Sequence, residues 1–277
     1  MKLHAYGDSW TEGLGCDLKI ERTLSKEFSL SGHPISTPEL IKFRHEHSWV
    51  KKLAGKLGLE WENHGVSASS NYKIFQKAVE DIKEKKVTEK DFVVVMWSST
   101  LRDPLPFLPA GEWLTWSEQK LKQHPENFIN SYKSENETYD NFLREYKKFF
   151  LTNLYSSNYY SIINQNYICF LQEMLKSYNI RYVFCDAFDS MINPILDKED
   201  KSYLIDSIPY YGFKFYKNTN KTFSHTLMEL KKKNIWEHDL DDVSTVTQMT
   251  HPMHPNAFGY SIIADILASF IHDRKIL

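Results

Sequence analysis

The segment Asp91–Trp97 is the feature that most restricts how this chain can fold. After Asp91 it reads Phe92-Val93-Val94-Val95-Met96-Trp97, apolar at every position and rich in valine. A strand without polar residues buries both of its faces, as the central strands of parallel sheets do. The segment therefore predicts a parallel sheet that is covered by helices on both sides.

Strand and helix patterns alternate along the rest of the chain. Further short strands are expected at residues 2–6, 59–62 and 180–185. Apolar residues recur at helical spacing over 49–57, 74–82, about 140–178 and after Asn256, which we expect to cap the last helix. This alternation is typical of parallel α/β folds. We therefore predict a flavodoxin-like, three-layer α/β/α fold with a central parallel sheet.

The chain is predicted to form a single domain, residues 1–277, with two insertions. With 42% hydrophobic residues, the chain can bury a substantial core. Residues 20–46 show no clear period and are expected to be irregular. The insertions are expected at about 103–140 and 190–250, over the carboxyl rim of the sheet. Both insertions are rich in aromatic residues, which could contact sugars or acyl chains of a substrate or could form a small core within each insertion. These residues are Trp113, Trp116, Tyr132, Tyr139, Tyr210, Tyr211, Phe213, Phe215, Tyr216 and Trp236.

Polar residues follow each predicted strand at its carboxyl end. Gly7-Asp8-Ser9 follows the first strand, Asn63–Asn71 the second and Ser98–Arg102 the third, and Asp186 comes after the fourth. In open parallel sheets, ligands bind at the carboxyl ends of the strands. Four separate segments are therefore expected to meet on one rim.

Ser9 and His254 are the candidate catalytic residues on this rim. A serine hydroxyl needs a base to take its proton and donors to hold the oxyanion that forms. A histidine fixed by Pro252 and Pro255 before a helix can act as that base. The alternative interpretation involves no catalysis: Asp8-Ser9 caps a helix, and the prolines with Asn256 only mark the start of another helix.

The two segments resemble blocks of the SGNH, or GDSL-type, hydrolase family. Gly7-Asp8-Ser9 is similar to the block that carries the nucleophile, and His254-Pro255-Asn256-x-x-Gly259 is similar to the block with the catalytic histidine. The stretch Asn63-x-Gly65-Val66-Ser67-Ala68-Ser69 resembles the second block. The family usually has glycine where Ala68 stands and uses its backbone N–H in the oxyanion hole. The resemblance thus implies oxyanion donors at Ser9 and Ala68.

Two departures from the family pattern mark a divergent member. The usual Gly-x-Asn-Asp block after the third strand is replaced by Trp97-Ser98-Ser99-Thr100, so that Ser99 takes the place of the asparagine donor. The usual aspartate three residues before the histidine is absent, and His251 stands there. A Ser9–His254 dyad, orientation by His251, or an acid from elsewhere would each repair this loss; Asp186, Asp241 and Asp242 are the candidate acids.

The resemblance implies acyl-ester chemistry through an acyl-serine. We predict a serine esterase that hydrolyses an acyl ester of a carbohydrate or another small molecule, with deacetylation of a carbohydrate as one such reaction. The alternatives are a carbohydrate O-acetyltransferase with the same Ser–His chemistry and a non-catalytic SGNH-like binding domain. Residues beside the catalytic positions are assigned to substrate binding: Asp8, Trp10, Asn71, Trp97 and Arg102.

The remaining expectations concern partners and location. The formal net charge of −2 gives no sign of a nucleic-acid partner. His45-x-His47 and His251-x-x-His254 do not form a known metal motif, so no metal and no cofactor is expected. Three cysteines without metal spacing, no signal peptide and no long apolar run predict a cytoplasmic protein without a membrane segment.

Overall fold

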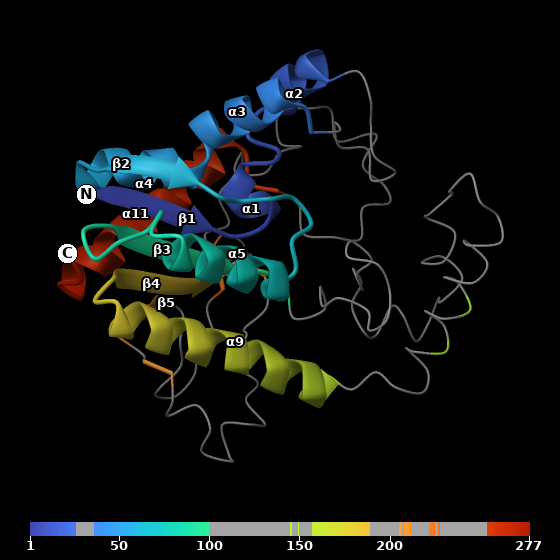
Figure 1. Cartoon of the computed structure of the whole chain (residues 1–277). Coiled ribbons are helices and arrows are strands. Elements are labelled where there is room, and N and C mark those ends of the chain that lie inside the picture. Colours follow the sequence, from blue (N-terminus) through green and yellow to red (C-terminus); the bar gives the residue numbers. More distant parts are fainter. Residues whose placement is uncertain are drawn as a thin grey trace.

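The computed structural model shows a sheet with helices packed on both of its sides (Figure 1). It describes residues 1–25, 36–99, 145, 149, 157–188, 205–206, 208–211, 222–224, 227 and 254–277. The insertion expected at 103–140 lies outside these residues, as does most of the one expected at 190–250.

The five strands run parallel in the order β2-β1-β3-β4-β5. They are β1 (Lys2–Tyr6), β2 (Glu60–Asn63), β3 (Phe92–Trp97), β4 (Arg181–Asp186) and β5 (Tyr210–Tyr211). This is the strand order of flavodoxin-like folds. Every residue of β3 is buried, as its apolar sequence predicted. The predicted fold class is therefore confirmed.

Two pairs of helices form the outer layers (Figure 1). Helices α4 (Trp49–Leu57) and α11 (Ala257–Asp273) pack on one face, against Leu3, Val94 and other core residues. Helices α5 (Asn71–Lys83) and α9 (Ser157–Ser177) pack on the other. Within the described part of the chain, no helix combines the length and apolar character needed to cross a membrane.

Most of the local signals for these helices act as expected, and the hydroxyl of Ser48 is the exception. Gly58 ends α4 with a left-handed φ of +67°, and the side chain of Asn256 accepts two backbone hydrogen bonds at the start of α11. Ser48 is at the N-cap position of α4, but its hydroxyl donates to the carbonyl of His45 instead of capping the helix. The predicted helix at 140–178 is described as α9 from Ser157, with what precedes it largely outside the described residues.

Residues 20–46 are not irregular throughout, and this expectation was wrong. Helix α2 (Leu18–Leu24) begins after the cap Asp17, and α3 (Pro38–His47) begins after the cap Thr37 with a proline in its first turn. An apolar period is missing from α3 because one of the two residues that it buries is Arg44. A helix that buries an ion pair gives no hydrophobic periodicity.

One short stretch of the region predicted as the second insertion belongs to the sheet. Tyr210 and Tyr211 form β5, which pairs with β4. Tyr210 packs edge-on against Phe184, and Tyr211 stacks on Phe223. Tyr210 therefore lies in the core, and the partly buried Tyr211 packs against it.

Candidate functional site

The turn after β1 presents Ser9 at the start of α1 (Ser9–Glu12). Asp8 caps this short helix, because its Oδ1 accepts from the backbone N–H of Trp10 at 3.0 Å. A side chain at Gly7 would bring its Cβ within 2.0 Å of Thr11 Oγ1, so this position requires glycine. As the first residue of the helix, Ser9 has a backbone N–H without an intrahelical partner.

The segment around His254 is fastened to the chain just after Ser9. The backbone N–H of Ala257 donates to the carbonyl of Cys16 at 2.9 Å. The hydroxyl of Tyr260 donates to the carbonyl of Leu14 at 2.7 Å. The start of α11 is thereby held beside the first helix, although the two segments stand at opposite ends of the sequence.

Ser9 and His254 meet as the sequence predicted. Nε2 of His254 lies 3.0 Å from Oγ of Ser9, within hydrogen-bond distance. The serine is 2% exposed, and Nδ1 of His254 is shielded from solvent. A neutral imidazole in this position can accept the hydroxyl proton and return it later.

The loop after β2 is joined to the Ser9 turn by backbone contacts. The N–H of Val66 donates to the carbonyl of Gly7 at 3.1 Å, and the amide of Asn63 donates to the carbonyl of Thr11 at 2.7 Å. A Cβ on Gly65 would lie 2.3 Å from a backbone nitrogen of α1. The glycine is required because the two backbones touch.

Ala68 occupies a strained turn position on this loop. The N–H of Ser69 donates to the carbonyl of Val66 at 3.1 Å, which closes a turn, and Ala68 has φ +62°. Residues with a side chain pay for this left-handed conformation, whereas glycine does not. This explains physically why a glycine is favoured at such a position.

A buried ion cluster supports the same loop. Arg44 is held between two carboxylates, with Nη1 2.6 Å from Glu12 Oε1 and Nη2 2.9 Å from Glu21 Oε2. The second oxygen of Glu12 accepts from the backbone N–H of Ser67 at 2.5 Å. Burial raises the pKa of Glu21, although Arg44 counteracts it in part. We did not anticipate this cluster, whose only sequence signal was charge in a region without apolar period.

The residues after β3 are clamped to α5 and to the Ser9 turn. Asn71 donates through Nδ2 to the carbonyls of Ser98 at 3.2 Å and Ser99 at 3.3 Å. Its Oδ1 accepts from the N–H of Ser98 at 2.8 Å. The Ser98 hydroxyl donates to Asp8 Oδ2 at 2.6 Å. One side chain thus fixes the backbone next to Ser99, the predicted third oxyanion donor.

Four of the five residues predicted to bind substrate are buried beneath the surface of the rim. The side chains of Asp8, Trp10, Asn71 and Trp97 are all fully buried. In this conformation Asp8 and Asn71 hold loops in place. Arg102 lies outside the described residues. A direct substrate contact for any of the five stays a prediction.

The group that orients His254 also stays a prediction. His251, Asp241 and Asp242 lie outside the described residues. Asp186, the other candidate acid, is buried at the end of β4 and accepts from the hydroxyl of Tyr210 at 2.6 Å.

A second polar cluster lies on the α5 side of the sheet, beside a cavity of about 660 Å³. His45, His64, Lys73 and Lys77 are among the described residues that line the cavity, whereas neither Ser9 nor His254 is. Burial lowers the pKa of His64 to about 4 and also lowers the pKa values of His4 and His45. Burial thereby favours the neutral form of each ring.

Comparison with known proteins gives the family. The profile of the family described as "Family of unknown function (DUF6071)" matches residues 30–210. The chain belongs to DUF6071. Ser9 and His254 lie outside the matched range, so that membership of DUF6071 assigns them no role. No curated protein matches this DUF6071 member.

Several solved structures are similar to this DUF6071 chain at low identity. A lipolytic protein of the G-D-S-L family from Desulfitobacterium hafniense is 13% identical with a TM-score of 0.42, over 97% of this chain and 98% of the other. A GDSL-like lipase from Parabacteroides merdae is 14% identical with a TM-score of 0.43, over 100% and 96%. The acetyl xylan esterase AlAXEase is 11% identical with a TM-score of 0.42, over 97% and 98%. Likeness of this degree identifies neither activity nor substrate, which must be argued from the site.

Proposed function

We propose that this protein is a serine hydrolase of the SGNH type that cleaves acyl esters through an acyl-Ser9 intermediate. The observation that carries the proposal is the 3.0 Å contact between His254 Nε2 and Ser9 Oγ. Nucleophile and base within this distance are the structural signature of nucleophilic catalysis. The serine is placed on a strand-to-helix turn at the carboxyl end of a central parallel strand, where ligands bind in such sheets.

The proposed reaction has two halves. His254 Nε2 takes the proton of Ser9 as Oγ bonds to the ester carbonyl carbon, and the carbonyl oxygen becomes an oxyanion. The backbone N–H groups of Ser9 and Ala68, with Ser99, would hold this oxyanion. The intermediate collapses, and the leaving alkoxide takes the proton from His254. Water then attacks acyl-Ser9 with His254 again as base, which releases the acid and restores the serine.

The proposed substrate is an acetyl ester on a carbohydrate. The support for this substrate is the aromatic content of the predicted insertions, since aromatic rings pack well against the C–H faces of sugars. If a sugar hydroxyl replaces water in the second half, the same residues give an O-acetyltransferase. A binding domain would keep the ligand without any acyl-serine.

A fluorophosphonate probe tests the activated serine directly. Wild type should be labelled and should hydrolyse p-nitrophenyl acetate, and Ser9→Ala should lose both. Ser177→Ala, on an exposed hydroxyl at the end of α9, is the matched control and should behave like wild type. A folded wild type that is neither labelled nor active, and still binds acetylated oligosaccharides, would show that the binding domain is correct. Acetyl transfer to an added oligosaccharide, with little hydrolysis, would show the transferase.

A further inference from the structure

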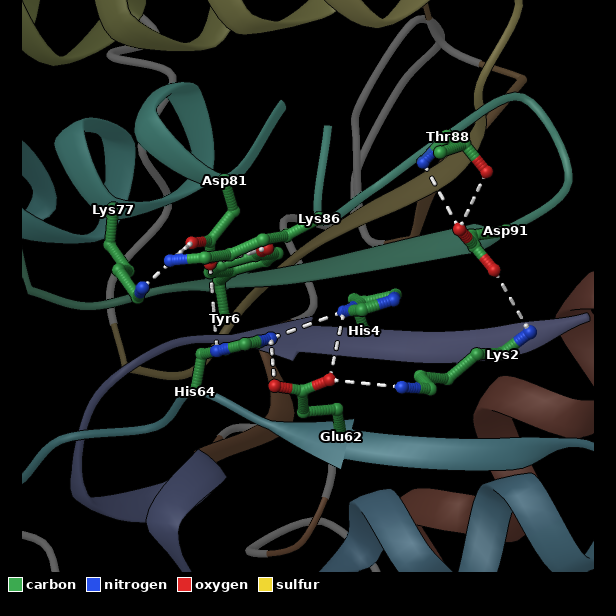
Figure 2. A network of polar contacts seen from close by, with 10 residues as sticks. All are labelled: Lys2, His4, Tyr6, Glu62, His64, Lys77, Asp81, Lys86, Thr88 and Asp91. Atoms are coloured by element: carbon green, nitrogen blue, oxygen red, sulfur yellow. Dashed lines mark hydrogen bonds and ion pairs between the residues drawn. The ribbon is translucent and has the colours of Figure 1, made fainter. Parts of the chain in front are cut away.

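Two histidines and a glutamate converge at the β2 edge of the sheet (Figure 2). His4 lies on β1 and is paired in register with Glu62 on β2. His64 follows β2 two residues after Glu62, so that both side chains project from the same face. Figure 2 shows the three side chains pointing toward one another, with dashed lines joining each pair.

The three groups are spaced as metal ligands are. His4 Nδ1 lies 3.2 Å from His64 Nε2. The carboxylate of Glu62 lies 3.8 Å from each of these nitrogens, Oε2 facing His4 and Oε1 facing His64. In a tetrahedral zinc site, bonds of about 2.1 Å place the ligand atoms about 3.4 Å apart. We propose that His4, Glu62 and His64 form a zinc-binding site.

The surroundings of His64 favour the tautomer that a metal needs. Asp81 Oδ2 lies 3.6 Å from His64 Nδ1, which favours a proton on that nitrogen and leaves the lone pair of Nε2 toward His4. Asp81 is itself held by the hydroxyl of Tyr6 at 3.1 Å and by Lys77 at 2.7 Å. A carboxylate behind a ligating histidine is a common outer partner of zinc sites. The ring of Tyr6 stacks on His64 with an interplanar angle of 8° and supports one face of the imidazole.

Zinc binding requires three rearrangements. The rings of His4 and His64 are nearly coplanar, with an interplanar angle of 9°, and their nitrogens face each other as in an N–H···N hydrogen bond. His4 must therefore carry its proton on Nε2 rather than Nδ1, and the rings must tilt toward a common point. Lys2 must also release Glu62 Oε2, to which its Nζ donates at 3.2 Å.

The site has a route for the ion and one position for a further ligand. His4 is almost completely buried, whereas the side chain of Glu62 is 47% exposed. An ion can therefore enter past Glu62. Three protein ligands leave the fourth tetrahedral position to water or another small ligand, as in zinc sites that are not purely structural.

Zinc titration of the chelator-treated, full-length protein tests the proposal. Wild type should bind one Zn²⁺ with a Kd in the micromolar range or below, and bound Co²⁺ should give a tetrahedral visible spectrum. His64→Gln and Glu62→Gln should each weaken binding about 10–100-fold or more. His272→Gln, on an exposed ring far from the cluster in sequence, is the matched control and should bind like wild type.

Lys2→Met separates a metal site from a purely electrostatic cluster. Removal of the ammonium group frees Glu62 and should tighten zinc binding several-fold. Zinc should also raise the Tm of wild type but not the Tm of Glu62→Gln. Because the side chain of Glu62 is half exposed, this variant should still fold, and its failure to bind zinc would not result from unfolding. A wild type that takes up no zinc would overturn the proposal, and so would Glu62→Gln and His64→Gln variants that bind zinc as tightly as wild type.

Discussion

Glu12 and Ser67 are joined across a sequence separation of 55 residues, because Glu12 Oε2 accepts the backbone N–H of Ser67 at 2.5 Å. Glu12 is three residues after Ser9, and Ser67 directly precedes Ala68. The nucleophile turn and the predicted oxyanion loop are therefore connected by one carboxylate. Arg44, 2.6 Å from the other oxygen, holds that carboxylate in place.

Glu12→Gln should lower kcat about 10-fold or more with a smaller change in KM, because a small displacement of an oxyanion donor affects the transition state most. The side-chain amide of glutamine has only one oxygen, so its NH2 group would face another donor, either Arg44 or the backbone N–H of Ser67. Arg44 keeps its ion pair with Glu21 but loses one of its two carboxylate partners, so the free energy of unfolding should fall by about 1–3 kcal/mol. Steady-state kinetics and urea denaturation measure the two effects.

Glu21→Gln is the matched comparison for Glu12→Gln. Glu21 binds the same arginine but does not contact Ser67; its other oxygen accepts from the N–H of Gly15 at 2.8 Å. It should lose stability while kcat remains close to that of wild type. Equal losses of kcat in the two variants would mean that Glu12 acts only through stability.

Ala68→Gly should stabilise the protein by about 0.5–1 kcal/mol and leave activity unchanged. Glycine removes the steric cost of the left-handed φ of +62°, which exceeds the entropy that glycine adds to the unfolded chain. It also keeps the backbone N–H. Ala68→Val, with a β-branched side chain at the same φ, should be destabilised. The urea midpoints of the three proteins test this order of stability. A glycine variant less stable than wild type would contradict the claim that Ala68 is strained.

Asn71→Ala should destabilise the protein by about 2–3 kcal/mol and lower kcat. The substitution leaves the buried N–H of Ser98 and the carbonyls of Ser98 and Ser99 without the amide that holds them. If Asn71 only bound substrate, its replacement by alanine would raise KM and leave the stability of the protein unchanged. Thermal unfolding, measured beside kcat and KM, therefore separates the clamp seen in the structure from the role predicted from sequence.

The fold and the Ser9–His254 pair could be predicted because both depend on local sequence. An apolar strand, helical spacing and turn residues each act over a few positions, and the topology of a parallel sheet then brings the strand ends to one rim. The pairing of Ser9 with His254 also drew on the resemblance of their two segments to SGNH hydrolase motifs, since each segment alone is equally typical of a helix start.

The features that were missed depend on pairings between distant residues. Arg44 is buried only because Glu12 and Glu21 neutralise it, so that α3 lacks the apolar pattern by which helices are recognised. The cluster of His4, Glu62 and His64 exists because β1 and β2 pair with His4 opposite Glu62. The spacing of residues in the sequence does not reveal which residues of two strands pair. Known metal motifs have ligands close together in the chain, so they do not identify a site whose ligands come from two distant strands.

The stability of the chelator-treated protein should fall as the pH drops from about 6.5 to about 4. An unfolded histidine has a pKa of about 6.5, whereas burial lowers that of folded His64 to about 4. The unfolded state therefore binds more protons in this window, and the stabilisation present above pH 6.5 is lost on acidification, by about 3 kcal/mol at most from this residue. Among the described residues, the charged or titratable groups that face the ring are Asp81 and Lys77 from α5, Glu62 from β2, and His4 and Tyr6 from β1.

Urea denaturation across this pH range, compared between wild type and His64→Gln, isolates the contribution of His64. The variant should lose less stability between pH 6.5 and 4, because glutamine takes up no proton, while nearby carboxylates titrate in both proteins. An NMR titration of the His64 ring in folded wild type gives the same quantity without a substitution. A ring that titrates near pH 6.5, together with equal slopes in the two proteins, would show that the fold does not hold His64 neutral.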